Sequence, residues 1–340
     1  MNTQEINKVA VVILNWNGAP LLRRYLPSVV ANTNRQIADV IVADNGSTDQ
    51  SLALLAVQFP DVQVIHLEEN FGFAEGYNRA LAQLPYRYTV LLNSDVRAPR
   101  GWVEPLYEYM EKHPEVGACQ PKLLKDYDGE QPVFEYSGAV GGYLDCHGYP
   151  FCRGRLFGSV EDDHGQYDRE EPYDVFWATG AALMVRTEVY RKAGGLDSFF
   201  FAHMEEIDLC WRIHLLGYKI KCVTQSFVYH FGGASLPSSS PRKTYLNFRN
   251  NLFLLYKNLP KADGRRLLLV RRLYDTLSIV MFIATFQWAN ARAVIRAHNH
   301  YRRSRHRYDG IQPEVNLLKT MPEAHRNIVL EYYLKGRRKF

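Results

Sequence analysis

The residue types best suited to catalysis lie in residues 199–212, which have the sequence FFFAHMEEIDLCWR. There, aromatic residues lead into an adjacent pair of carboxylates, Glu205 and Glu206. A carboxylate beside a large aromatic surface is a suitable general base for a bound substrate. The alternative is structural, because the apolar periodicity predicts a short helix, and acids in the first turn of a helix interact favourably with its dipole. Asp208 and Arg212 are four residues apart on that helix and are expected to pair.

Polar residues follow each of four predicted strands in the N-terminal part of the chain. The strands, at residues 8–14, 39–43, 62–67 and 88–92, alternate with helical patterns and predict an open, mostly parallel, Rossmann-like α/β sheet flanked by helices. Ligands of such sheets bind beyond the carboxyl ends of the strands. Turn chemistry alone could explain any one polar cluster, but four on one edge are better explained by a nucleotide-sized site. The clusters are residues 15–18, 44–49, 70–75 and 93–95.

The sequence lacks the usual glycine-rich phosphate loops. No G-x-G-x-x-G follows the first predicted strand, and no G-x-x-x-x-G-K-[ST] occurs. The simplest alternative is a divalent cation, with Asp95 as its best first ligand, because oxygen donors and a bridging diphosphate suit Mg²⁺ or Mn²⁺. The structural alternative is an Asp that caps a turn.

The motifs VVILNWNG, DNGSTDQS, NFGFAEGYNRA and LLNSDV resemble, in this order, those of family 2 glycosyltransferases with the GT-A fold, in particular the bacterial rhamnosyltransferase-like branch. The resemblance continues through residues 178–212 and ends near Val228-Tyr229-His230, so that it covers about residues 8–232. It implies an inverting enzyme that moves a sugar from a nucleotide-diphosphate sugar to a glycan or lipid-linked sugar acceptor in cell-surface polysaccharide synthesis. Rhamnose as the transferred sugar follows from the resemblance alone.

The resemblance assigns donor-binding roles by position. Asp44 would hydrogen-bond the nucleobase, with Asn15 and Asn17 lining the nucleotide pocket beside it. The full set of residues expected to bind the nucleotide sugar is Asn15, Asn17, Asp44, Asn45, Asn70, Asn93 and Asp95.

The same resemblance assigns the metal ligands. Asp95 occupies the last position of the family's D-x-D-like motif and would bind the cation, Mg²⁺ or Mn²⁺, together with the donor diphosphate. The first position is Asn93 instead of Asp, which lowers the local negative charge. His230 matches a position where the family often supplies a further metal or diphosphate contact, and the alternative is a buried or capping His.

Position matching places the general base at Glu206, where the family usually has the Asp of an acid-Asp pair. The additional methylene moves the carboxylate by about one bond length. Glu205 is the second candidate, and Asp208 and Arg212 are expected to be structural.

The segment 113–175 is irregular and is expected to cover the acceptor side of the cleft. Its sequence EDDH at residues 161–164 could suggest a metal site, but the polar surroundings favour a solvated loop. The following DVFWATGAALMV predicts a buried strand, a Gly-Ala turn and a helix start. Gly180 and Ala181 in this turn serve either close approach of a substrate or tight packing, and the sequence does not separate the two.

The chain divides by charge. Residues 1–241 contain 20 basic and 30 acidic residues, whereas residues 242–340 contain 21 basic and six acidic residues. We therefore expect a GT-A domain at 1–241, with a nucleotide-sugar half at about 8–112 and an acceptor half at about 113–235. A linker at 236–241 precedes a basic helical region at 242–340, which either associates with an anionic membrane or forms oligomers.

The helical region is predicted to have helices at 245–258, 262–297 and 322–334. The apolar stretch 276–289 is too short to span a bilayer. It predicts either an amphipathic helix at a membrane surface, with flanking arginines on head groups, or a core or dimer helix.

Composition excludes several other classes. Five cysteines without a C-x-x-C pair argue against a disulfide framework or zinc site. The N-terminus has no signal-peptide pattern, which favours a cytoplasmic protein that is at most peripheral to the inner face of the cytoplasmic membrane. No nucleic-acid-binding motif is present. The two remaining alternatives are a nucleotidyltransferase, disfavoured because residues 15–18 lack Lys and Arg, and a non-catalytic, membrane-bound sugar-nucleotide-binding scaffold.

Overall fold

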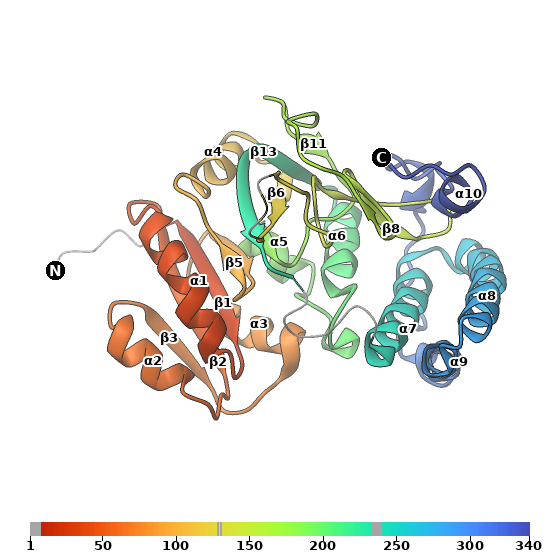
Figure 1. The fold of residues 1–340 in the computed structure, drawn as a ribbon, viewed down its shortest axis with the longest axis horizontal. Helices are drawn as coiled ribbons and strands as arrows, with labels where there is room; N and C mark the ends of the chain where they lie inside the picture. Colours follow the sequence, from red (N-terminus) through yellow and green to blue (C-terminus); the bar gives the residue numbers. More distant parts are fainter. Residues whose placement is uncertain (1–7, 128, 130, 233–239) are drawn as a thin grey trace.

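The computed structural model describes residues 8–127, 129, 131–232 and 240–340 and has a nine-stranded sheet at its centre (Figure 1). The strand order is β11-β13-β6-β12-β4-β1-β2-β3, with β5 paired to β13. Strands β3, β2, β1 and β4 are parallel, and so are β6 and β13, whereas β12 is antiparallel to both of its neighbours. This arrangement confirms the predicted α/β fold. The strands are β1 (Val9–Asn15), β2 (Ala38–Asn45), β3 (Gln63–Leu67), β4 (Tyr88–Leu92), β5 (Val96–Arg97), β6 (Val116–Lys125), β11 (Tyr173–Asp174), β12 (Ala182–Arg186) and β13 (Lys219–His230).

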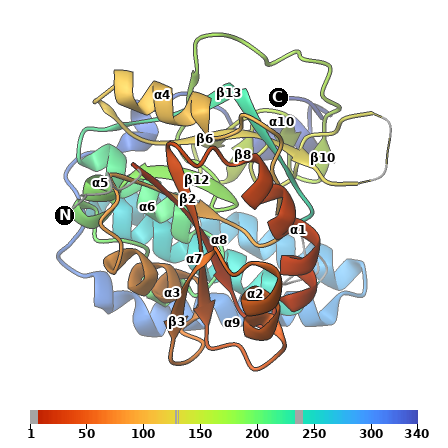
Figure 2. The same cartoon turned by 90° about the vertical axis from the view of Figure 1, so that its left-hand side faces the viewer.

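Helices cover both faces of the sheet, which explains the continuous apolar runs of its parallel strands. Alternate residues of β1 pack into two separate apolar clusters. One cluster contains α1 (Ala19–Asn32), α2 (Ser51–Gln58) and α4 (Glu104–Lys112), and the other contains α3 (Gly72–Ala82), α5 (Thr187–Lys192) and α6 (Glu205–Leu215). Figure 2 shows α3 on one side of β1–β3 and α1 and α2 on the other.

The parallel strands end together at one edge of the sheet. The register places Asn15 at the end of β1 opposite Asp44 in β2, and places Asp44 opposite His66 in β3. Polar residues after these strands therefore start from neighbouring points, as the sequence predicted.

The irregular middle segment contributes a small antiparallel sheet of β7 (Gly142–Leu144), β8 (Pro150–Cys152), β9 (Arg155–Leu156) and β10 (Ser159–Val160). The prediction that residues 161–164 form a solvated loop is wrong for two of their acids. Glu161 and Asp163 are buried, and each has a polar partner. Lys122 lies 2.8 Å from the Asp163 carboxylate, and the Tyr167 hydroxyl donates to Glu161.

The predicted helix start at ALMV is also wrong. Residues 182–186 form β12, which pairs with β4 and β6 in the middle of the sheet, and α5 begins only at Thr187. Pairing partners from distant parts of the chain decide this element, which a local pattern cannot reveal.

The C-terminal region contains α7 (Pro241–Asn258), α8 (Lys261–Ala284), α9 (Trp288–Ser304) and α10 (Ile328–Tyr333). In Figure 1, α7, α8 and α9 gather on the side of the molecule opposite α1 and α2. Short 3₁₀ turns are η1 (Ser198–Phe200), η2 (Arg305–Tyr308) and η3 (Leu317–Lys319). Of the predicted linker, residues 236–239 lie outside the described residues, and Pro241 already belongs to α7.

Two predicted helices differ from the structure. The helix expected at 262–297 is interrupted between α8 and α9, where Phe286 has a φ of 58°. The apolar stretch 276–289 is consequently the end of α8, a turn and the start of α9, and is not one helix. The helix expected at 322–334 is limited to α10. Within the described part of the chain, no helix combines the length and the apolar composition needed to cross a membrane.

Candidate active site

The ends of β1 and β2 are joined by polar side chains. The Asn15 Nδ2 donates to Asp44 Oδ1 at 3.0 Å and to Ser47 Oγ at 3.1 Å, and the backbone N–H of Ser47 donates to Asp44 Oδ2 at 3.0 Å. The Asn17 Oδ1 accepts from the backbone N–H of Thr48 at 2.8 Å. The structure thus brings Asn15, Asn17 and Asp44 together. Because a carboxylate has about four lone-pair sites, Asp44 can still accept from a ligand.

Asn45 and Asn70 lie at the same edge but are engaged with the neighbouring loop. The Asn45 Nδ2 donates to Asn70 Oδ1 and to the Gly72 carbonyl, both at 3.1 Å, and Asn45 Oδ1 accepts from the Phe71 backbone N–H. These bonds fix the entry into α3. The geometry therefore gives these two predicted site residues a positioning role, and it does not require that either of them contacts a ligand directly.

Asp95 and His230 come together from distant parts of the chain. Asp95 follows β4 and His230 ends β13, and the Asp95 Oδ1 lies 3.1 Å from His230 Nε2. The Asn93 Nδ2 lies 3.3 Å from the same ring nitrogen. Both Asp95 and His230 are buried. All three predicted residues therefore face one point.

A fourth residue, Glu135, lies behind this group. Its Oε1 is 3.3 Å from the other ring nitrogen of His230, Nδ1. A carboxylate behind a ligating histidine fixes the ring and strengthens it as a metal ligand. Oxygen from Asp95, nitrogen from His230 and this support from Glu135 fit a divalent cation. Glu135 was not predicted from the sequence, because it lies in the irregular segment and belongs to no motif.

The charges around His230 determine its protonation. Burial alone would lower the pKa of the imidazole, but hydrogen bonds and charge from Asp95 and Glu135 outweigh burial and raise that pKa to about 10. A bound cation requires the neutral ring. Metal binding here is therefore expected to release a proton.

A second cluster of potential metal ligands consists of the consecutive residues Asp145, Cys146 and His147, whose ligand atoms lie within 4.8 Å of one another. The Asp145 carboxylate accepts from the backbone N–H groups of His147, Tyr149 and Ile328. These bonds explain the buried carboxylate by its role in fixing the turn and the C-terminal segment.

The two candidate bases begin helix α6. Burial raises the pKa of Glu206 to about 7, and burial together with the charge of Glu206 raises the pKa of Glu205 well above its usual value. The Oε2 atom of each side chain is buried without a hydrogen-bond partner among the described residues. A pKa near neutrality suits a general base, and Glu206 meets this requirement.

Glu206 reaches the same edge as Asp95 through the turn before β12. A Cβ placed on Gly180 would lie 3.7 Å from the Glu206 Cβ and 3.6 Å from Phe73 Cζ. The next carbonyl, that of Ala181, accepts from the Asn93 backbone N–H at 3.0 Å. Residues 180–181 therefore lie between the base and the Asp95 loop. Both Cβ distances are ordinary contacts, so packing does not require glycine here.

The loop before the two glutamates is strained. Phe201, His203 and Met204 have φ values of 67°, 70° and 73°, in the left-handed region that side chains disfavour. Asn250 of α7 holds this loop, since its Nδ2 lies within hydrogen-bond distance of the carbonyls of Phe200, Ala202 and His203 at 2.7–2.9 Å. Helix α7 thus positions the loop that leads into the candidate bases.

Helix α7 also carries a lysine that interacts with the site. Lys243 is half-buried, burial lowers its pKa, and it interacts electrostatically with Glu135. Burial, followed by the charge of Lys243, lowers the pKa of His203 to about 4. Lys243 is therefore close enough to both Glu135 and the loop before α6 to interact with them electrostatically. Nothing in the sequence distinguishes this lysine from the other basic residues of the C-terminal region, so its position was not predicted.

The predicted pair of Asp208 and Arg212 is confirmed, with 2.7 Å between the guanidinium and the carboxylate. Asp208 also lies 2.9 Å from the Lys257 Nζ and accepts from Asn258 at 2.7 Å. The pair is therefore part of a larger buried network that joins α6 to α7.

Comparison with solved structures defines the class of fold. The chain superimposes on GalNAc-T7 with UDP, GalNAc and Mn²⁺ with a TM-score of 0.59 at 17% identity, over 76% of this chain and 49% of that chain. It superimposes on the mannosyltransferase PcManGT of Pyrobaculum calidifontis, in complex with GDP-Man and Mn²⁺, with a TM-score of 0.51 at 15% identity, over 87% of this chain and 75% of that one. The fold is the GT-A glycosyltransferase fold.

Sequence comparison then gives the family. The model of glycosyl transferase family 2 matches residues 10–191, more than half of the chain, and the chain belongs to this family. A relative, the N-acetylglucosaminyl-diphospho-decaprenol L-rhamnosyltransferase of Mycobacterium tuberculosis, is 28% identical over 233 residues, which are 65% of this chain and 75% of the relative. The expected rhamnosyltransferase-like branch is thereby confirmed.

Proposed function

We propose that the protein is an inverting glycosyltransferase that transfers a sugar, rhamnose by analogy with the relative, from a nucleotide-diphosphate sugar to a hydroxyl of a lipid-linked or other glycan acceptor in cell-surface polysaccharide synthesis. The observation that carries this proposal is the position of Glu206, with a pKa of about 7, across residues 180–181 from the Asp95 and His230 pair. Transfer with inversion requires a base on the face of the sugar opposite the leaving diphosphate, and Glu206 would supply that base to a sugar bound beside residues 180–181.

The donor would occupy the strand-end edge. Asp44, with Asn15 and Asn17, would bind the nucleoside, and Asp95 with His230 would hold Mg²⁺ or Mn²⁺ beside the diphosphate. When bound, the cation supplies positive charge that stabilises the leaving nucleoside diphosphate. Asn93 lies within reach of the same group, and Lys243 offers a second positive charge to the cleft.

The chemical step exchanges one bond to the anomeric carbon for another. The acceptor hydroxyl oxygen attacks that carbon from the face opposite the diphosphate, the bond from carbon to diphosphate oxygen breaks, and the nucleoside diphosphate leaves with the bonding electrons. The ionised Glu206 carboxylate takes the hydroxyl proton. Glu205 is the second candidate for this role, and burial and the charge of Glu206 raise its pKa as well.

Donor turnover tests this function. Purified protein is incubated with Mn²⁺ or Mg²⁺ and a panel of dTDP-, UDP- and GDP-sugars, with and without acceptor, and nucleoside diphosphate release is measured. We expect release with one donor class and loss of release on chelation. If the protein binds none of these donors and releases no nucleoside diphosphate from them, the proposal is excluded. Release of pyrophosphate would assign the protein to the nucleotidyltransferases instead.

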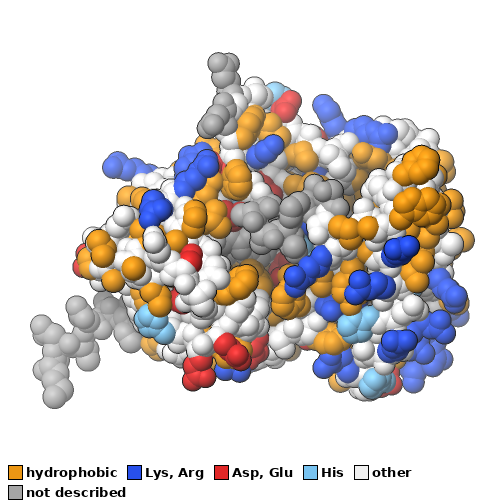
Figure 3. Space-filling model, turned by 60° about the horizontal axis from the view of Figure 1, so that its bottom comes forward, with side chains coloured by type: hydrophobic (Ala, Val, Ile, Leu, Met, Phe, Trp, Pro, Cys, Tyr) orange, Lys and Arg blue, Asp and Glu red, His pale blue; other side chains and the backbone are white. Residues whose placement is uncertain are grey.

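The C-terminal helices are proposed to hold the enzyme at the anionic, cytoplasmic face of a membrane. Apolar side chains of α8 and the following turn are exposed, and basic residues of the same region, including Arg265, Arg266 and Arg272, are exposed near them in the sequence. Figure 3 shows lysine and arginine side chains and hydrophobic patches together on the right-hand part of the molecule, where these helices lie. Apolar side chains flanked by arginines favour an interface with anionic lipid. The exposed apolar residues include Leu269, Leu273, Leu277, Val280, Met281 and Phe286.

A further inference from the structure

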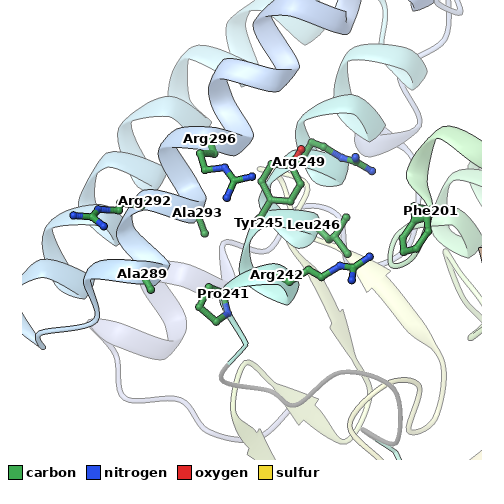
Figure 4. A pocket seen from close by; sticks show the side chains of 10 residues that line it. All are labelled: Phe201, Pro241, Arg242, Tyr245, Leu246, Arg249, Ala289, Arg292, Ala293 and Arg296. Atoms are coloured by element: carbon green, nitrogen blue, oxygen red, sulfur yellow. The ribbon is translucent and has the colours of Figure 1, made fainter.

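Helices α7 and α9 enclose a hollow of about 680 Å³, which we call the arginine groove (Figure 4). Four of its ten lining residues are arginines, and none is acidic. The arginines are Arg242, Arg249, Arg292 and Arg296, and the other lining residues, which include Phe201 and Leu246, are mainly apolar.

The positive charge of the groove is not balanced by carboxylates. Arg242 lies over the Phe201 ring at 5.3 Å, Arg296 lies over the Tyr245 ring at 5.5 Å, and Arg249 donates to the carbonyl of Phe200. Within the described part of the chain, no carboxylate forms an ion pair with any of the four. In Figure 4, Arg242 extends toward Phe201 and Arg296 toward Tyr245, whereas Arg292 points away from the centre. Arg249 is buried and engaged with the loop before α6, so the guanidinium groups available to an anion in the groove are those of Arg242 and Arg296.

The groove connects the loop before α6 with the apolar surface of the C-terminal helices. Phe201 forms one wall and lies only four residues before Glu205. At the other end, Ala289 directly follows the exposed Trp288 and the α8–α9 turn, in which the Phe286 side chain is 81% exposed. A ligand with an apolar tail, an anionic linker and a sugar would match these three environments in order.

We propose that the arginine groove binds the phosphate groups of a lipid-linked sugar acceptor and presents its sugar to Glu206. Arginine forks match phosphate oxygens, and the apolar lining suits the first part of a lipid chain. This inference rests on the proposed function and adds to it that the acceptor carries phosphate beside its lipid.

Calorimetric titration of the full chain with three probes tests the proposal. The probes are farnesyl diphosphate below its micellar concentration, inorganic pyrophosphate and farnesol. We expect farnesyl diphosphate to bind at least tenfold more tightly than either of the other two. The double variant Arg242→Gln/Arg296→Gln should weaken its binding at least tenfold, with a thermal unfolding midpoint close to that of the wild type.

The matched control is Arg23→Gln/Arg100→Gln, which removes two exposed arginines that lie outside both the groove and the C-terminal helices. It should leave binding unchanged. Equal weakening by both double variants, or no weakening by the groove variant, would overturn the proposal. Binding to phosphatidylglycerol vesicles but not to farnesyl diphosphate would also overturn it and assign the arginines to membrane head groups. Donor binding by the wild type is measured separately, so a failure of the proposed function is distinguished from a failure of this groove.

Discussion

At the scale of single residues, the environment of each carboxylate separates its role from that of its neighbours. Glu206 is partly buried with a pKa of about 7, whereas Asp208, two positions further along α6, faces two cations in a closed network. The sequence shows three acids within four positions and does not reveal these differences. Burial and partners decide which acid is available to a substrate.

Substitution Glu206→Gln is expected to lower transfer by about 10²- to 10⁴-fold, the usual contribution of a general base, while donor binding is retained. Transfer by the wild type should rise with pH through about 7, because only the ionised form accepts the proton. Acceptor transfer and donor affinity are measured across this range. Retained transfer in the Gln variant, with loss in Glu205→Gln, would move the role to Glu205.

The raised pKa of Glu206 also has a cost in stability. The Glu206 carboxyl binds its proton more tightly in the folded than in the unfolded protein. The free energy of unfolding therefore falls as the pH rises from 4.5, the usual pKa of this side chain, to about 7. Above neutral pH, the free energy of unfolding of the Glu206→Gln variant should therefore exceed that of the wild type by about 1–3 kcal/mol. In mild acid the difference should be much smaller. Chemical denaturation of both proteins at several pH values checks this difference.

Substitution Gly180→Ala tests whether the turn before β12 leaves room for a substrate. An added Cβ meets only ordinary contacts, so the free energy of unfolding should change by less than about 1 kcal/mol. Activity should fall at least tenfold because the methyl group occupies space beside Glu206. The control Gly158→Ala adds a methyl group with nothing within 4 Å and should change neither quantity. Full activity with lost stability in Gly180→Ala would assign this glycine to packing.

At the scale of elements, the site depends on helices far from it in the sequence. Asn250, Arg249 and Lys243 all come from α7, and the first two bind the loop that precedes α6. This loop has three residues in the left-handed region, so it would relax without these bonds. Helix α7 therefore supports the proposed catalytic machinery directly.

Replacing Asn250 by Ala should destabilise the fold by about 1–3 kcal/mol, because the part-buried carbonyls of Ala202 and His203 lose their side-chain donor. The turnover number should fall at least tenfold with little change in the KM for the donor. The loop leads into α6, which carries the candidate bases, whereas the predicted nucleotide-binding residues lie elsewhere. Asn299→Ala, at an exposed position of α9, is the control. An equal change in donor KM would contradict a role limited to the loop.

Replacing Asp208 by Asn should destabilise the protein by about 3–5 kcal/mol, because Arg212 and Lys257 would lose their shared buried anion. Burial alone would raise the pKa of Asp208, but Arg212 and Lys257 hold it below its usual value. Its contribution is therefore present above about pH 4 and is lost as pH falls further. The exposed pair of Glu188 and Lys192 gives the control Glu188→Gln, which should have little effect on unfolding.

At the scale of the whole molecule, charge and apolar surface are both unevenly distributed. The C-terminal helices carry most of the excess positive charge, and α8 exposes an apolar face beside it. A large apolar face on a protein surface usually meets a partner or a membrane. The positive surroundings favour an anionic bilayer as that partner.

The double substitution Leu277→Glu/Phe286→Glu should lower binding of the full chain to phosphatidylglycerol vesicles at least fivefold in a sedimentation assay, since both side chains are exposed, at 57% and 81%. Val57→Glu alters a similarly exposed apolar residue of α2 and should have no effect. If the wild type does not sediment with vesicles but forms a dimer that the double substitution dissociates, the apolar face belongs to a second copy.

The extent to which the sequence predicted this molecule follows from how local each signal is. Strand runs, strand-end polar residues and the adjacency of Asp95 and His230 could be predicted because they repeat an ordered set of motifs. Glu135 and Asn250 could not, because neither belongs to a motif and each acts through a contact formed only in the folded chain. The same reason explains the failure at β12, whose partners come from β4 and β6.

The bonds from Asn250 to the loop of residues 200–203 have a practical meaning for anyone dividing this protein into pieces. The motif-bearing part of the chain ends near residue 232, and a fragment designed on motifs alone would stop there. Such a fragment would contain every residue expected to touch the donor and both glutamates, but it would lack the Asn250 and Arg249 side chains that bind the loop before them. We therefore expect an active fragment to extend beyond the motifs, at least through α7.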